Sequence, residues 1–200
     1  MRAATVIERA RSVLEGDRRA IAQAGSSLGQ GFVEAVDILL ATRGKTLVTG
    51  MGTSGAVARR IAHLLSCGGT PAVFVSAADG LHGGLGSVAA GDTLISISKG
   101  GESDELNRFT ELARGRGAHV IVMTAAPASS LAALADCVIV IDTPADTDPG
   151  HMMAMGSAIA ASAVGDALAV VLMEERGYAW EQFEVTHPGG AVGKAIQDRR

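Results

Sequence analysis

Residues 46–55 read Thr-Leu-Val-Thr-Gly-Met-Gly-Thr-Ser-Gly, and this stretch decides the fold. A short apolar, β-branched run is followed at once by glycines at the spacing G-x-G-x-x-G, and then by an amphipathic stretch. Runs of this kind are typical of strands that are buried on both faces of a parallel sheet. The glycine-rich turn is typical of the connection from such a strand into a helix. The segment therefore predicts a strand–turn–helix unit.

The same alternation continues along the chain. Strands are expected at residues 46–49, 72–75, 93–98, 119–124 and 137–141, and helices at 54–67, 103–116, 129–135 and 152–176. Strands that alternate with helices indicate crossover connections, which place helices on both faces of a parallel sheet. Upstream, residues 5–24 and 28–42 carry apolar residues at helical spacing. We therefore expect one domain over residues 1–200: an α/β core at about 45–197, with a doubly wound, five-stranded parallel sheet, preceded by a helical hairpin at about 5–42.

Composition excludes several classes of function. The chain has 17 Lys and Arg against 21 Asp and Glu, and only 3% of its residues are aromatic. It lacks the basic clusters and stacking rings that sequence-independent nucleic-acid binding needs. The two cysteines show no metal-binding spacing, and the N-terminus has no apolar signal core. The apolar stretch at 158–173 is interrupted by Asp166 and is too short for a membrane span. We expect a cytoplasmic protein with no metal, membrane or nucleic-acid partner.

The loop after the first strand suits an anion. In open parallel sheets, ligands bind beyond the carboxyl ends of the strands. Gly52, Thr53 and Ser54 place two hydroxyl groups beside the free N–H groups of a helix N-terminus, which suits a single phosphate. The glycine pattern, with Asp79 downstream, also matches the dinucleotide fingerprint, so an NAD-dependent enzyme and a plain tight turn are alternatives.

The loop after the third strand repeats this chemistry. Ser98, Gly101 and Ser103 can converge on the same phosphate, although Ser103 is also an ordinary N-cap. A bound phosphate would repel the carboxylate of Glu102, so phosphate binding does not explain an acid at this position. Proton transfer on the carbon skeleton of a phosphorylated substrate would explain it, and a solvated first-turn acid is the alternative.

Two histidines lie in glycine-rich loops. His82 follows the second strand, and His187 follows the last long helix. Histidine titrates near neutral pH and suits the opening of a sugar ring or the movement of hydroxyl protons. Each could also be an incidental surface residue.

These segments together resemble the sugar isomerase (SIS) domain family. The resemblance covers about residues 30–197 and rests on the two loops described above, on Gly165-Asp166-Ala167-Leu168-Ala169, and on His187-Pro188-Gly189-Gly190. Within that family the chain is most similar to arabinose-5-phosphate isomerases, and it resembles their single-domain members, which lack CBS domains.

The resemblance implies a reaction and a set of roles. Relatives interconvert D-arabinose 5-phosphate and D-ribulose 5-phosphate through an enediol, without metal or cofactor, as homodimers or homotetramers that share pocket residues. By position, Glu102 corresponds to a catalytic carboxylate, His82 and His187 to two functional histidines, and Asp146 to a second acid. Ser54, Ser98 and Ser103 correspond to the phosphate cradle. Either histidine is expected to act across the subunit interface.

Two residues depart from the family pattern. Thr53 stands where such isomerases carry lysine, and Asp146 is one methylene shorter than the glutamate expected there. The missing cation weakens anion binding, and the shorter acid changes the reach of a proton acceptor. An isomerase of a different sugar phosphate and a phosphosugar-binding sensor without catalysis are therefore the alternatives.

Overall fold

The computed structural model describes residues 2–189. Its helices and strands, in chain order, are α1 (Arg2–Ser26), α2 (Gln30–Ala41), β1 (Thr46–Gly50), α3 (Gly52–Cys67), β2 (Ala72–Phe74), α4 (Ala77–Gly80), β3 (Thr93–Ile97), α5 (Asp104–Gly115), β4 (His119–Thr124), β5 (Cys137–Val140), α6 (Gly156–Glu175) and α7 (Trp180–Thr186). All five predicted strands are present, and their ends differ from the prediction by at most one residue. The predicted end of the core, at about residue 197, lies outside the described residues.

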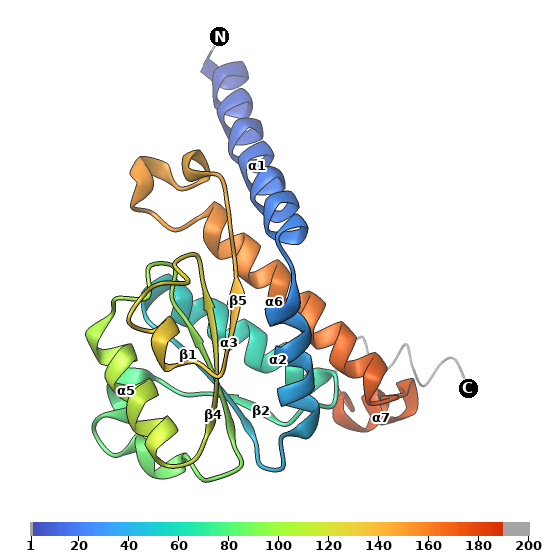
Figure 1. Cartoon of the computed structure of the whole chain (residues 1–200). Helices are drawn as coiled ribbons and strands as arrows, with labels where there is room; N and C mark the ends of the chain where they lie inside the picture. Colours follow the sequence, from blue (N-terminus) through green and yellow to red (C-terminus); the bar gives the residue numbers. More distant parts are fainter. Residues whose placement is uncertain (1, 190–200) are drawn as a thin grey trace.

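The five strands form one parallel sheet in the order β2-β1-β3-β4-β5. The chain moves outward from β1 to β2 and then returns to the other side of β1 with β3. The direction of winding therefore reverses between β1 and β3, which are direct neighbours, with Gly50 in register with Ile97. The expected doubly wound α/β sheet is confirmed, and its switch point lies at the carboxyl ends of these two strands (Figure 1).

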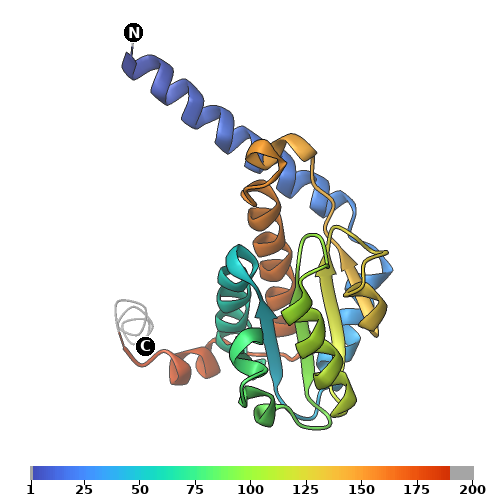
Figure 2. The ribbon, with the colours of Figure 1, turned by 90° about the vertical axis from the view of Figure 1, so that its left-hand side faces the viewer.

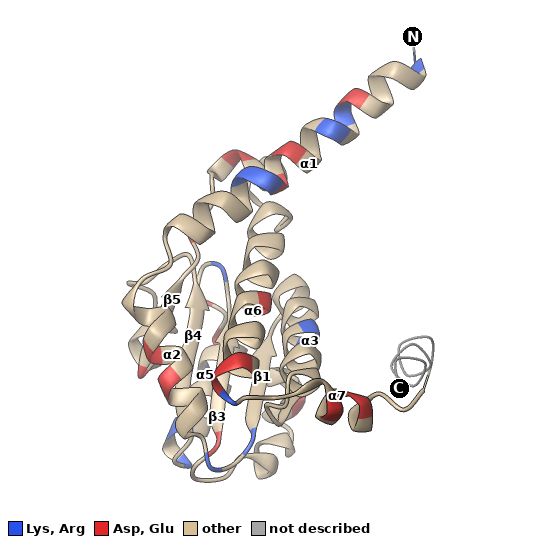
Figure 3. Cartoon of the chain, turned by 90° about the vertical axis from the view of Figure 1, so that its right-hand side faces the viewer, with Lys and Arg blue, Asp and Glu red and all other residues tan. Residues whose placement is uncertain are grey.

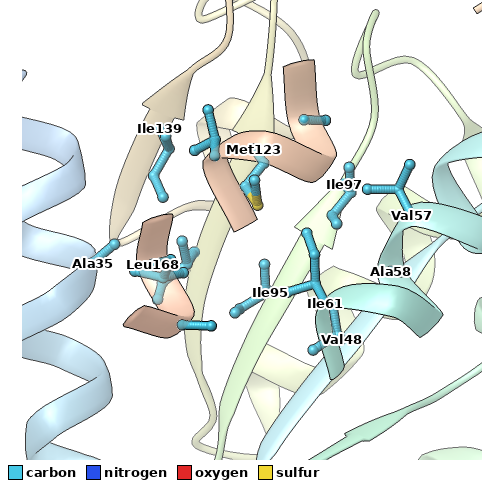
Figure 4. Close-up of a cluster of buried hydrophobic side chains, with 14 of the residues drawn as sticks. Ala35, Val48, Val57, Ala58, Ile61, Ile95, Ile97, Met123, Ile139 and Leu168 are labelled. Atoms are coloured by element: carbon cyan, nitrogen blue, oxygen red, sulfur yellow. The ribbon is translucent and has the colours of Figure 1, made fainter. Parts of the chain in front are cut away.

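Both faces of the sheet are covered by helices. Successive side chains of each strand point to opposite faces, so the strands contribute to a buried cluster on each side. Val48, Ile95 and Ile121 pack under α2, α3 and α6 (Figure 4). Leu47 and Leu94 point the other way, toward α5 and Phe109. This two-sided burial is why the strands read as continuous apolar runs in the sequence.

α6 is the central helix of one layer. Of the helices in the described part of the chain, it alone is long and apolar enough to cross a membrane, but half of its most apolar stretch is buried inside the fold. It packs closely on α3, since a Cβ atom at Gly165 would overlap the side chain of Ile61. This packing is that of a core helix. α6 begins at Gly156, later than the predicted residue 152, and the turn that precedes it contains Gly150 and His151, which both have positive φ angles.

The two N-terminal helices exist, but the predicted hairpin is wrong. α1 and α2 follow one another roughly end to end, and α1 projects beyond the body of the domain (Figures 1 and 2). The apolar residues that α1 buries lie only in its second half, at Ala20 and Ala24, where it packs on α6. α2 packs instead on β5, so the two helices do not need each other.

The projecting part of α1 carries both charge and apolar surface. Acidic and basic segments alternate along it (Figure 3). Its exposed large apolar side chains are Val6, Ile7, Val13, Leu14 and Ile21.

Candidate functional site at the switch point

The turn between β1 and α3 closes tightly because it is made of glycines. A Cβ atom at Gly50 would lie 2.8 Å from the carbonyl oxygen of Ser54, and one at Gly55 would lie 2.8 Å from the carbonyl oxygen of Gly50. Gly52 has a φ of +53°, which favours glycine. The G-x-G-x-x-G pattern therefore reflects close backbone packing, and it brings the N-terminus of α3 to the end of the sheet.

A small pocket, open to solvent, lies at this end of the sheet. It is bounded by the start of α3, the ends of β3 and β4, and the start of α6. Its polar lining consists of Ser54, Lys99, Thr124 and Ser157. The apolar lining consists of Val57, Ile97, Met123, Ala125, Ile141, Ala154, Ala158 and Ala161.

Of the predicted phosphate ligands, Ser54 lines this pocket. Gly52 and Thr53 are exposed on the first turn of α3. Ser98 and Gly101 shape their own loop: the N–H of Gly101 donates to the Ser98 hydroxyl at 3.0 Å, and a Cβ atom at Gly101 would collide with Ser129. Ser103 is the N-cap residue of α5, although its side chain makes no capping hydrogen bond.

Glu102 is exposed and turned toward the loop that follows β4. The N–H of Ser130 donates to its carboxylate at 2.9 Å. This hydrogen bond, with a further contribution from the Ser130 side chain, lowers the pKa of Glu102 below its usual range. The group is therefore an anion at neutral pH, but it is not among the side chains that line the pocket in the described part of the chain.

The two predicted histidines lie far apart. His82 is exposed on the turn after α4, at the carboxyl end of β2. His187 follows α7, where its ring stacks on Phe183 with 3.8 Å between the ring centroids. That helix lies at the opposite, amino-terminal end of the sheet, where Tyr178 covers Gly69 (Figure 2). Within one chain, the structure does not bring His187 to the pocket, and residues 190–193 of its motif lie outside the described residues.

Asp146 is also outside the pocket. Its carboxylate accepts hydrogen bonds from the guanidinium of Arg19 on α1, at 2.8 and 3.1 Å. The Arg19 guanidinium lowers the pKa of Asp146. The structure therefore connects this predicted catalytic acid to the N-terminal helix.

Sequence reasoning missed a buried polar cluster that borders the pocket. The Lys99 ammonium donates to Asp148 at 2.6 Å, and the Ser157 hydroxyl donates to the same carboxylate oxygen at 2.6 Å. Burial acts to raise the pKa of Asp148, but the hydrogen bonds from Lys99 and Ser157 outweigh it, so that the pKa is lowered. Lys99 could have been found, because it directly follows Ser98 in a loop already identified. Nothing in the sequence marks Asp148 as a site residue, because its partner Lys99 lies 49 residues away in the chain.

Among residues 2–189, no three His, Cys, Asp or Glu side chains gather as a metal site would require. The polar groups of the pocket are hydroxyls, one ammonium group and the N-termini of two helices. Such groups suit an oxyanion, because helix N-termini and cations attract negative charge.

Comparison with known proteins agrees with this chemistry. The arabinose 5-phosphate isomerase KdsD of Pseudomonas aeruginosa is 34% identical over 180 residues, which cover 90% of this chain and 55% of that protein. KdsD of Escherichia coli K12 is 34% identical over 186 residues, which cover 93% of this chain and 57% of that protein. The chain thus spans a little more than half the length of these curated relatives.

Solved structures match over nearly the whole chain. A putative sugar-phosphate isomerase from Listeria monocytogenes has a TM-score of 0.88 at 34% identity, covering 92% of this chain and 97% of that one. A protein of E. coli CFT073 in complex with arabinose 5-phosphate has a TM-score of 0.90 at 29% identity, covering 94% and 100%. The SIS domain family matches residues 39–171, more than half of the sequence. The chain belongs to the SIS domain family.

Proposed function

We propose that this protein is an aldose–ketose isomerase of sugar phosphates and that its substrate is a pentose phosphate, D-arabinose 5-phosphate or D-ribulose 5-phosphate. The observation that carries the proposal is the pocket at the switch point, where Ser54 and Lys99 lie beside the start of α3. Relatives named arabinose 5-phosphate isomerase and a neighbour solved with arabinose 5-phosphate support the substrate class. Neither a metal nor an organic cofactor is part of the proposed mechanism.

Glu102 acts as the base in this proposal. Its carboxylate takes the proton from C2 of the aldose and returns it to C1, through an enediol. The group is ionised at neutral pH, and because the hydrogen bonds from Ser130 lower its pKa, its basicity rises when it leaves Ser130 for the substrate. Because the side chain is exposed and held by one hydrogen bond to Ser130, it can reorient toward a bound sugar at small cost.

His82 and His187 assist ring opening and move hydroxyl protons. Because His187 lies at the amino-terminal end of its own sheet, it serves the pocket of a second copy, and the working unit is a homodimer or homotetramer. Mixed oligomers test this: subunits with Glu102→Gln and subunits with His187→Ala would form hybrids that contain one intact pocket. We expect activity to return on mixing. Failure to return would remove His187 from a neighbouring pocket.

NMR in deuterated water, with a panel of pentose and hexose phosphates, tests the proposal directly. Isomerisation, with deuterium uptake at C1 or C2 of a pentose phosphate, is the expected result. Uptake with a hexose phosphate alone would keep the reaction and change the substrate. We place the reaction in the cytoplasm.

A phosphosugar sensor is the second candidate. The observation that favours it is that the carboxylates of both Glu102 and Asp146 are held by groups outside the pocket. Tight binding of a sugar phosphate, together with no deuterium uptake from any member of the panel, would select this function instead.

A further inference from the structure

A buried ion pair connects two sides of the pocket. Lys99, in the loop after β3, contacts Asp148, in the turn that leads into α6. The Asp148 side chain is 2% exposed, whereas that of Lys99 is 43% exposed. The pair therefore has one fixed, buried member and one member that remains open to solvent and to the pocket.

The carboxylate of Asp148 is held from several directions. One oxygen accepts the N–H groups of Met155 and Ser157, at 2.8 and 3.1 Å. The other accepts the hydroxyl of Ser157 and the ammonium of Lys99. Because the start of α6 shares the negative charge of Asp148, the charge of Lys99 is only partly neutralised. The position of the carboxylate is also fixed, and with it the position of the ammonium group.

Lys99 has capacity left for a ligand. An ammonium group has three N–H donors, and the structure shows one of them in use, toward Asp148. Among the described residues that line the pocket, Lys99 alone carries a charge. Ser54 lines the same pocket and adds a hydroxyl donor, whereas the single hydroxyl proton of Ser157 is already donated to Asp148. A dianion placed there would meet the ammonium group of Lys99 and the hydroxyl group of Ser54.

We propose that Lys99 binds the phosphate of the substrate and that Asp148 is the positioning residue that aims Lys99 into the pocket. The proposal rests on the proposed function for the identity of the substrate. Thr53 provides no cation in the loop after β1, so the positive charge for the phosphate comes from the loop after β3. A Lys ammonium binds phosphate as a point charge, and its contribution depends on where the charge is held.

The test measures binding of inorganic phosphate to the full chain by calorimetry, for the wild type and for Lys99→Met. We expect the dissociation constant of phosphate to rise at least about tenfold in Lys99→Met, which corresponds to the loss of one charged contact. Lys99→Arg keeps the charge and should restore most of the affinity. Asp148→Asn, which keeps the shape but removes the partner charge, should weaken phosphate binding less than Lys99→Met does.

The chain provides a matched control. Lys45 also donates to a buried carboxylate, that of Asp92, at 2.7 Å, and this pair lies at the amino-terminal end of the sheet. Lys45→Met removes an equivalent ion pair away from the pocket and should leave phosphate binding within about twofold. An equal loss in Lys45→Met would show that phosphate binding only follows general stability, and would overturn the proposal. An unchanged dissociation constant in Lys99→Met, or no phosphate binding by the wild type, would overturn it as well.

Turnover separates this proposal from the proposed function. If a sugar phosphate is isomerised, Lys99→Met and Asp148→Asn should raise KM by a larger factor than they lower kcat. If no sugar phosphate is turned over but Lys99→Met still loses phosphate, the isomerase function fails and the role of Lys99 stands. If the wild type is active and KM is unchanged in Lys99→Met, the role of Lys99 fails and the isomerase function stands.

Discussion

The guanidinium of Arg19 holds the carboxylate of Asp146 through two hydrogen bonds, and so connects the projecting helix α1 to the turn before α6. Both side chains are largely exposed, at 42% and 65%. Exposed ion pairs of this kind contribute little to stability, because water and salt screen them, so the pair can open easily. For Asp146 to act on a substrate, as the proposed function requires, its carboxylate must first leave Arg19.

Substituting each partner separately tests this relationship. Arg19→Met should leave the midpoint of a urea titration nearly unchanged and should preserve kcat. Asp146→Asn should lower kcat at least about tenfold if the acid acts on substrate. If the two variants behave alike, the role of Asp146 is confined to anchoring α1.

Glu102→Gln should abolish turnover and keep the shape of the loop. A glutamine oxygen can still accept the N–H of Ser130, so substrate binding should remain, while kcat should fall by about 10²–10⁴-fold. Glu105→Gln is the matched control, because Glu105 is an exposed acid on the first turn of α5. Steady-state kinetics and a binding titration on both variants measure these effects. Full activity in Glu102→Gln would show that Glu102 is not the base.

The ionisation of Glu102 also predicts how activity declines at acidic pH. The pKa of Glu102 is lowered, so the group loses its proton below the usual glutamate value of about 4.3. Activity that depends on the carboxylate should therefore stay constant as pH falls to about 5, and decline only below that value. A measured kcat/KM that declines with a midpoint near pH 6 would point to a histidine as the limiting group instead.

Asp148 should make stability depend on pH in acid. Its pKa is lowered in the folded state, so at low pH the unfolded chain binds a proton more readily than the folded one. The stability it contributes is present above the unfolded value of about 4 and is lost as pH falls below it. Asp148→Asn should reduce the free energy of unfolding at pH 7 by about 2 kcal/mol and flatten its decline in acid. Denaturant titrations at several pH values measure both effects, and an undiminished slope in the variant would contradict them.

Gly100 and Gly101 are adjacent glycines at which the effect of adding a side chain on stability should differ. Gly101 has a φ of +70°, and a Cβ atom there would collide with the Ser129 hydroxyl. Gly101→Ala should therefore destabilise the protein by more than about 1 kcal/mol. At Gly100 a Cβ atom would meet nothing within 4 Å, so Gly100→Ala should be close to neutral. Thermal unfolding of both variants tests the comparison.

The sheet could be predicted because its strands are short and buried on both sides, which leaves apolar runs such as residues 120–123. The course of α1 could not be predicted in this way. Helical periodicity shows that residues 5–24 form a helix, but it does not show which partner the apolar side faces. That partner is α6, more than a hundred residues later in the chain.

The site was predictable where its residues follow directly from strand ends. Ser54 lines the pocket because the helix that follows β1 begins at this end of the sheet, and its role toward a phosphate stays a prediction. The partners of Glu102 and Asp146 were not predictable, because Ser130 and Arg19 come from other elements and carry no motif. The role of Lys99 was not predicted, although its loop was recognised. That role depends on the ion pair with Asp148, which the sequence does not reveal.

The close contact between Gly165 and Ile61 has a consequence for the range of substrates. α3 carries Ser54 and Val57 on one wall of the pocket, and α6 carries Ser157 and Ala158 on the opposite wall. The distance between α3 and α6 is set at the point where Gly165, which has no side chain, lets Ile61 approach closely. A larger residue at 165 would wedge the helices apart and widen the pocket. The width of the pocket is therefore encoded partly in the hydrophobic core, and under the proposed function variants at Gly165 and Ile61 should change which chain length of sugar phosphate is preferred.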